Sequence, residues 1–129
     1  MAIPGSGDGQ EVLRRGGINN QTNNPTAFAF DGTSPTMGDE TETVPANHIV
    51  TILSIIWCEQ GSAHELIYLH LVLSDAKHVR LLHDAPLTAY GTYIWNEKIV
   101  LIGGDALKTT FASAANVDVY YSYLDQDWS

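Results

Sequence analysis

The chain has 129 residues, and 44% of them are apolar, which leaves room for one domain with a hydrophobic core. Its formal net charge is -9, from 15 acidic and 6 basic residues. This balance excludes a phosphate-backbone binder, which depends on a basic surface, so we expect no nucleic-acid partner. The single triplet Arg15-Gly16-Gly17 lacks the repeats and basic context of an RNA contact.

The first 45 residues have the composition of a linker or arm. They hold 7 of the 11 glycines and 4 of the 5 prolines, together with the acidic run Asp39-Glu40-Thr41-Glu42. Apolar residues are scattered there without a helical or strand period, so we divide the chain into an extended N-terminal arm (1–45) and a β-domain (46–129).

An arm of this kind has no core of its own and must lie against something. We predict that it runs across neighbouring subunits or partners, with Val12, Leu13, Phe28 and Phe30 as apolar pegs. Arg14 and Arg15, its only basic residues, would pair with acidic groups on a neighbour. The alternative is that the arm folds back on its own domain.

Residues 46–129 break into short β-type runs separated by turn residues at regular spacing. This pattern predicts an antiparallel β-sandwich, jelly-roll-like or Ig-like, of about seven strands. The expected strands are 49–57, 65–73, 78–83, 92–95, 99–102, 107–112 and 117–124. No stretch of ten or more residues has the apolar period of a helix.

Alternation assigns faces within two of these strands. In 65–73, Ile67, Leu69, Leu71 and Leu73 form one apolar face, whereas Tyr68 and His70 lie on a mixed face that solvent or a partner covers. In 117–124, Tyr121 and Tyr123 share one face with two valines, and Tyr120 lies on the other. We interpret the tyrosines as core and interface residues, with an aromatic platform for a glycan as the alternative. Tyr68, His70 and Tyr120 are the candidate interface residues.

Gly103-Gly104-Asp105, with Lys108 close behind, offers a choice between a phosphate cradle and a turn. A phosphate loop requires GxxxxGK[ST] between a strand and a helix, and a β-favouring run follows here instead. We therefore predict a hairpin turn in which glycine supplies a positive φ.

Catalytic and metal motifs are missing from the sequence. The five histidines include no HExxH pair; two of His70, His78 and His83 could approach each other across a hairpin, but a third metal ligand cannot be identified. There is no GxSxG, and Asp125 and Asp127 fit solvated charges in a polar tail better than a glycosidase pair. We expect no enzyme activity, no cofactor and no metal.

Cys58 is the only cysteine, so the chain cannot form an internal disulfide. It follows Ile55-Ile56-Trp57, and we predict a small buried apolar residue rather than a nucleophile. The apolar runs are far shorter than the about 18 residues of a membrane helix, and residues 1–10 lack a signal-peptide pattern. We expect no membrane partner, and a protein that is made and kept in a cytosol-like compartment until it assembles.

The order of elements in residues 44–125 carries a resemblance. The sequence runs from Val44-Pro45-Ala46-Asn47-His48 into an apolar strand ending at Trp57-Cys58, then from Ala85-Pro86-Leu87 to Tyr93-Ile94-Trp95. The Gly-Gly-Asp turn and a final Val117-Asp118-Val119 strand follow. This order resembles small β-sandwich virion proteins of tailed bacteriophages, such as capsid decoration (cement) proteins and head or tail accessory proteins.

The resemblance implies a non-enzymatic structural protein on the capsid surface of a virion, which binds the major capsid protein or other virion proteins and stabilises the shell. It also implies a symmetric homo-oligomer, in many relatives a trimer, with arms reaching to neighbours. The alternative is a receptor- or glycan-binding module of a tail or head fibre. No catalytic residues follow from the resemblance.

Overall fold

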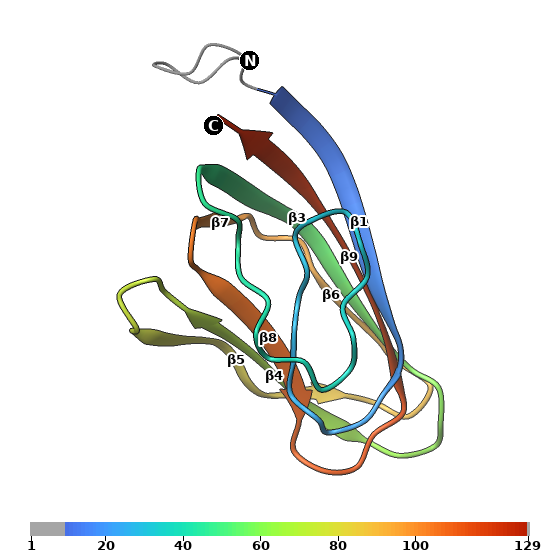
Figure 1. Ribbon diagram of the computed structural model, residues 1–129. Helices are drawn as coiled ribbons and strands as arrows, with labels where there is room; N and C mark the ends of the chain where they lie inside the picture. The colour runs from blue at the N-terminus through green and yellow to red at the C-terminus, as the bar shows by residue number, and fades with distance from the viewer. Residues whose placement is uncertain (1–9, 129) are drawn as a thin grey trace.

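The computed structural model describes residues 10–128, which form an all-β sandwich of two antiparallel sheets (Figure 1). The predicted fold class is thus confirmed. Within this part of the chain, no helix is long and apolar enough to span a membrane.

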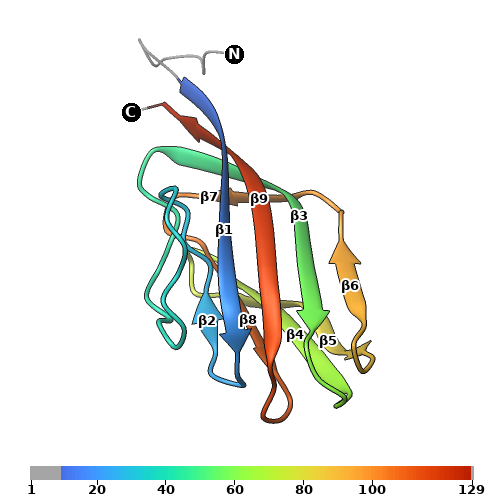
Figure 2. The same ribbon diagram turned by 90° about the vertical axis from the view of Figure 1, so that its right-hand side faces the viewer.

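The first sheet, sheet A, contains the longest strands. Its order is β1 (Gln10–Gln21), β9 (Val117–Asp127), β3 (His48–Glu59) and β6 (Thr92–Trp95), and β7 (Ile99–Ile102) also pairs with β3. β6 takes the second half of β3 and β7 the first half, so both lie along the same edge of that strand. Figure 2 shows β1, β9, β3 and β6 side by side, with β7 crossing at one end.

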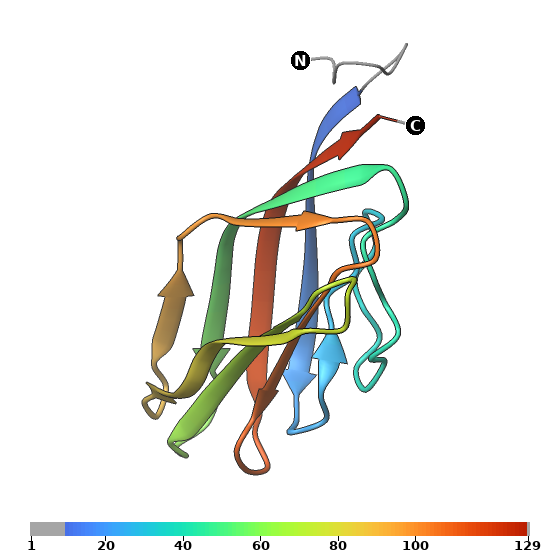
Figure 3. The same cartoon turned by 90° about the vertical axis from the view of Figure 1, so that its left-hand side faces the viewer.

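The second sheet, sheet B, has the order β2 (Thr26–Ala27), β8 (Ala106–Phe111), β4 (Glu65–Val72) and β5 (His78–Leu87). Its strands cross the inner side of sheet A (Figure 3). β4 and β5 form the hairpin that brings the predicted pair of histidines together.

The core lies between the sheets and is built by strict alternation. In β9 and β4, every second residue is buried, which confirms the assignment of Tyr121, Tyr123, Ile67 and Leu69 to the inner faces. Trp57 is fully buried, and its indole Nε1 donates a hydrogen bond of 3.1 Å to Thr109 Oγ1 on the opposite sheet. This bond satisfies the only polar atom of the largest core side chain.

The predicted arm is wrong for the described residues. β1 pairs with β9 along almost its whole length, from Gln10 opposite Asp127 to Gln21 opposite Val117. Residues 10–45 therefore belong to the sandwich, and the boundary predicted at residue 45 does not divide the fold. The backbone of β1 is held by its ladder with β9.

Phe28 and Phe30 lie in the core and are not pegs for a neighbour. Both are about fully buried, at 0% and 1% exposure, and their rings pack on Tyr121 and Tyr123. The Tyr121 hydroxyl donates to Ala29 O (2.6 Å) and accepts from Ala29 N (3.0 Å), which fixes this segment between the sheets. Burial raises the pKa of the Tyr121 hydroxyl, so it stays protonated.

All seven predicted strands of the second half exist, most within two residues of the expected bounds. β5 is longer than expected because the chain continues past Asp84, which takes a positive φ of 56° at a register shift, rather than ending there. The predicted burial of Cys58 is wrong: its side chain is exposed on the outer side of sheet A, because Trp57 and Glu59 take the inner positions.

Gly103-Gly104-Asp105 is a turn, as predicted, but it does not form a hairpin. β7 pairs in sheet A and β8 in sheet B, so the turn is the corner at which the chain changes sheet. Gly104 has a φ of +90°, which confirms the need for glycine. The turn consequently sets no register between strands: β7 takes its register from β3, and β8 takes its register from β4.

Candidate functional site

The outer side of sheet A is an apolar surface that no other described element covers. We call it the A face. Its outward positions follow from the register of β1, β9, β3, β6 and β7. Its apolar members are Leu13, Ile49, Leu53, Ile56, Ile94, Val100, Ile102, Tyr120 and Leu124.

Several side chains of the A face are strongly exposed. The exposed fractions are 73% for Leu13, 62% for Val100, 59% for Ile94 and 53% for Ile102, and Tyr120 is 41% exposed. Scattered exposed aliphatics need no explanation, but here they lie in adjoining rows of one sheet. Exposed apolar rows gathered on one face of a sheet are typical of a docking face.

Charges on the A face are confined to its margin. Glu11 and Arg15 lie on the edge strand β1, and Asp118 lies near the end of β9. One row between them pairs Leu124 with Thr51, and another pairs Tyr120 with Ile56. The row that separates these two is polar, with Ser122 opposite Ser54 and Arg15 at its outer edge, and its centre carries no ionisable group. An uncharged centre with a charged rim is the usual anatomy of a protein–protein interface.

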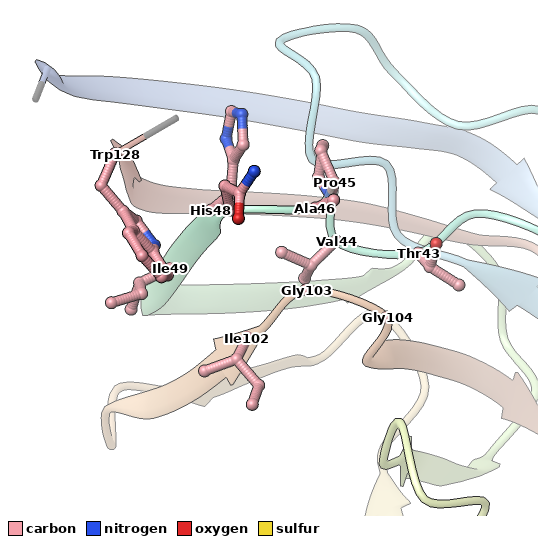
Figure 4. A pocket seen from close by; sticks show the side chains of 11 residues that line it. Thr43, Val44, Pro45, Ala46, His48, Ile49, Ile102, Gly103, Gly104 and Trp128 are labelled. Carbon is pink, nitrogen blue, oxygen red and sulfur yellow. The ribbon is translucent and has the colours of Figure 1, made fainter. Parts of the chain in front are cut away.

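An open hollow of about 670 Å³ adjoins the A face at one end of the sandwich. Figure 4 shows that its lining comes from three segments: the turn into β3, the β7–β8 corner and the C-terminal Trp128. Ile49 and Ile102 belong to both the hollow and the A face. The hollow thus extends the apolar surface around the end of the sheet.

An ion-pair cluster lies next to this hollow. The carboxylate of Asp125 is 3.1 Å from Arg14 Nε and 2.7 Å from His48 Nδ1, and His48 Nε2 is 3.6 Å from an oxygen of Asp127. Asp125 is only 3% exposed, so the prediction of two solvated carboxylates is wrong for it. β9 continues through Asp127 and turns the Asp125 side chain inward, where Arg14 of the same chain neutralises it.

The outer side of sheet B carries a polar groove, which we call the B groove. Two adjoining hollows of about 260 and 230 Å³ form it, and Tyr68, His70 and Thr110 line both. The first also contains Arg80, Leu82 and His83, and the second Pro25, Glu40, His78, Lys108 and Thr109. The Tyr68 and His83 rings lie 5.2 Å apart, and the Asp84 carboxylate, bonded to the Tyr68 hydroxyl, raises the pKa of that phenol.

His70 and His78 meet in the B groove, as the hairpin predicted. His70 Nε2 and His78 Nδ1 are 2.8 Å apart, so the N–H of one ring donates a hydrogen bond to the ring nitrogen of the other. Desolvation, reinforced by His78, Lys108 and Arg80, lowers the pKa of His70, although Glu40 opposes this. Among residues 10–128 no group of three or more potential ligands could hold a metal ion.

A pair of buried carboxylates, Glu59 of sheet A and Glu65 of sheet B, lies at the other end of β3 from the hollow. Each is 2% exposed. Desolvation, with the Glu59 charge as a second cause, raises the pKa of Glu65, whereas a hydrogen bond from Ser113 lowers it. Glu59 Oε1 accepts from Gly61 N at 3.0 Å, so this carboxylate serves the turn after β3.

The predicted site residues thus lie in three different places. Leu13, Arg15 and Tyr120 are on the A face, and Val12 is 37% exposed beside them on the edge strand. Tyr68 and His70 are in the B groove, on the other sheet from Tyr120. Phe28 and Phe30 are in the core, and Arg14 pairs with its own chain. The outward residues of β6 and β7 were not predicted as interface residues. In Ile99–Ile102, the alternation of a strand places Val100 and Ile102 on the side opposite to Ile99 and Leu101, and they are the exposed pair.

No family model and no curated protein matches the chain. Among solved structures, the chain is similar to the globular domain of zebrafish complement 1qA protein, with 14% sequence identity and a TM-score of 0.40. The similarity covers 88% of this chain and 94% of the zebrafish chain.

Proposed function

We propose that this chain is a non-enzymatic structural protein of a tailed bacteriophage, a decoration protein that binds the major capsid protein and stabilises the shell. It is made in the host cytoplasm and resides on the capsid surface of the virion. The order of elements that resembles such proteins supports this proposal, and the A face is the single structural observation that carries it.

The A face supplies attachment by burial of apolar surface. Covering four aliphatic side chains that are more than half exposed contributes on the order of 4–7 kcal/mol. Association of two bodies costs a comparable amount, about 4–15 kcal/mol, so one such contact binds weakly. A symmetric oligomer, a trimer in our proposal, presents several A faces at once and gains affinity through multivalency.

The shell is then stabilised by mass action. A partner that binds only the intact capsid shifts the equilibrium between intact and disrupted capsid toward the intact state. The gain in capsid stability grows with the number of equivalent sites that are occupied. The sandwich acts as a rigid body between its contacts on the shell, because its two sheets share one packed core.

Reconstitution on particles that lack the protein tests this function. Native protein should bind at hundreds of copies per particle, and coated particles should release DNA at a higher temperature than bare ones. Val100→Asp should reduce binding at least tenfold because it places a charge in an apolar contact. Val100→Thr, which keeps the shape, should lose much less.

Ala114→Asp is the matched control, since it adds the same charge at an exposed turn position between β8 and β9. Its binding should equal that of the native protein. A copy number of a dozen or fewer, or coated particles that are no more heat-resistant than bare ones, would overturn the decoration role.

The second candidate is a receptor- or glycan-binding module of a tail or head fibre. The B groove favours it, because its hollows are lined by an aromatic ring, hydroxyls and charged groups in the manner of a small-ligand site. Cell-surface binding by the purified protein would support this candidate, and the copy number in particles would separate it from decoration.

A further inference from the structure

We propose that the B groove binds an acidic saccharide, with Arg80, Lys108 and His70 holding its carboxylate. The proposal does not rest on attachment to a capsid. The A face and the B groove lie on the outer sides of different sheets, so either role can fail while the other stands.

The first observation is a row of basic side chains across three neighbouring strands. His70 on β4 lies opposite Lys108 on β8 and opposite Arg80 on β5, and His78 contacts His70 from the diagonal position. Two of the chain's six lysines and arginines thus flank one histidine pair, in a protein with a net charge of -9. Like charges placed opposite each other on a sheet destabilise it.

This clustering is only partly neutralised by the protein itself. Lys108 Nζ is 3.6 Å from Glu40 Oε1, whereas no carboxylate within residues 10–128 lies at ion-pair distance from Arg80. The other nearby acid, Asp84, is engaged by the Tyr68 hydroxyl and lies 3.8 Å from His83 Nε2. An incoming anion therefore finds Arg80 free, with His70 and Lys108 beside it.

The shape of the groove favours a saccharide over a peptide. Peptides on β-sheets are recognised mainly by strand addition at an edge, through unpaired backbone groups. Under the groove, β4 is paired on both sides, with β8 and with β5, so the floor of the groove presents side chains, whereas β5 is the edge strand of sheet B. Two small adjoining hollows, the Tyr68 ring and the Thr110 hydroxyl suit linked sugar rings with their hydroxyls.

Binding should strengthen as the pH falls. Desolvation lowers the pKa of His70, and His78 and Arg80 of β5 and Lys108 of β8 lower it further, whereas Glu40 acts in the opposite direction. A bound carboxylate favours the protonated imidazole, so proton uptake and ligand binding promote each other. His70 thereby makes the affinity of the groove dependent on pH between about 5 and 7.

Titration calorimetry of the full chain with tri-galacturonic acid tests the proposal. We expect measurable binding at pH 6, at least tenfold tighter than for a neutral galactose trisaccharide at the same ionic strength. The affinity should fall about three- to tenfold between pH 5 and pH 7, the effect of one imidazole losing its proton near an anion. His70→Gln should abolish this pH dependence.

Arg80→Ala should weaken binding by about tenfold or more, and Arg15→Ala, which removes the same charge from the edge of the A face, should not. Equal losses in both variants would reduce the effect to net charge and overturn the site. Absence of binding, or equal affinity for tri-galacturonic acid and the neutral sugar, would do the same. Equal affinity for triglutamate would assign the groove to acidic peptides and overturn the saccharide.

Discussion

Asp105 illustrates how a residue that looks like part of a ligand site can be fully occupied by the fold. Its Oδ1 accepts a hydrogen bond from Ser74 N (2.8 Å), and its Oδ2 accepts one from Ile102 N (2.9 Å). Its backbone carbonyl accepts from Val44 N at 2.8 Å. The acid of the Gly-Gly-Asp motif therefore joins the β7–β8 corner to two other loops, and nothing of it remains for a phosphate.

Gly104→Val should destabilise the protein by about 2–3 kcal/mol, since the φ of +90° is strained for a β-branched residue. The added Cβ would also lie 3.1 Å from Ser74 Cβ. Urea unfolding measures the loss as a lower midpoint. A variant with native stability would contradict the structural role of the corner.

Gly61→Val is the control for loss of glycine itself. Gly61 has no positive φ, and its nearest atom to an added Cβ is Glu59 Oε1 at 3.4 Å, an ordinary contact. Its unfolding free energy should change by less than about 0.5 kcal/mol.

At the scale of elements, the second half of the chain could be predicted and the first could not. Strands such as β4 and β9 can be predicted from the sequence because one side of each faces the core, so apolar residues recur at every second position. β1 lies at the edge of sheet A and contains Arg14-Arg15-Gly16-Gly17, which reads as a linker. A Cβ at Gly16 would collide with the Tyr121 ring, so the packing of β1 on β9 requires this glycine. The same glycine makes β1 resemble a linker in the sequence.

The site was predictable only in part for the same reason. The mixed face of β4 correctly marked Tyr68 and His70 as surface residues, and hairpin pairing brought His78 to them. The row of basic side chains through Lys108 depends on the pairing of β4 with β8, in which His70 lies opposite a residue 38 positions further along the chain. Local periodicity carries no information on such long-range pairing.

Phe28→Ala should lower the unfolding free energy of the isolated protein by about 3–5 kcal/mol, because it empties a fully buried site between the sheets. Leu13→Ala, in the same predicted arm but 73% exposed, should change it by less than about 0.5 kcal/mol. Chemical denaturation of both variants separates the two models. Equal, small effects would restore the view of residues 10–45 as an arm outside the core.

For the whole molecule, the two outer surfaces differ in chemistry and point in opposite directions, since they belong to the two packed sheets (Figures 2 and 3). The A face is largely apolar and uncharged at its centre, whereas the B groove concentrates histidines and basic side chains. If the A face lies on a shell, the B groove faces outward into the medium. A coat of such proteins would then display one groove per copy at high density.

Decorated particles should consequently adhere to an immobilised polygalacturonate surface much more strongly than isolated protein does, because many weak grooves engage together. Bare particles provide the baseline, and retention on the surface at pH 6 is the measurement. Particles coated with the Arg80→Ala variant should lose retention yet keep the heat resistance of native-coated particles, since the substitution lies outside the A face. A loss of heat resistance in parallel would mean that the two sheets do not act as separate surfaces, and retention unchanged by Arg80→Ala would place the adhesive site elsewhere on the particle.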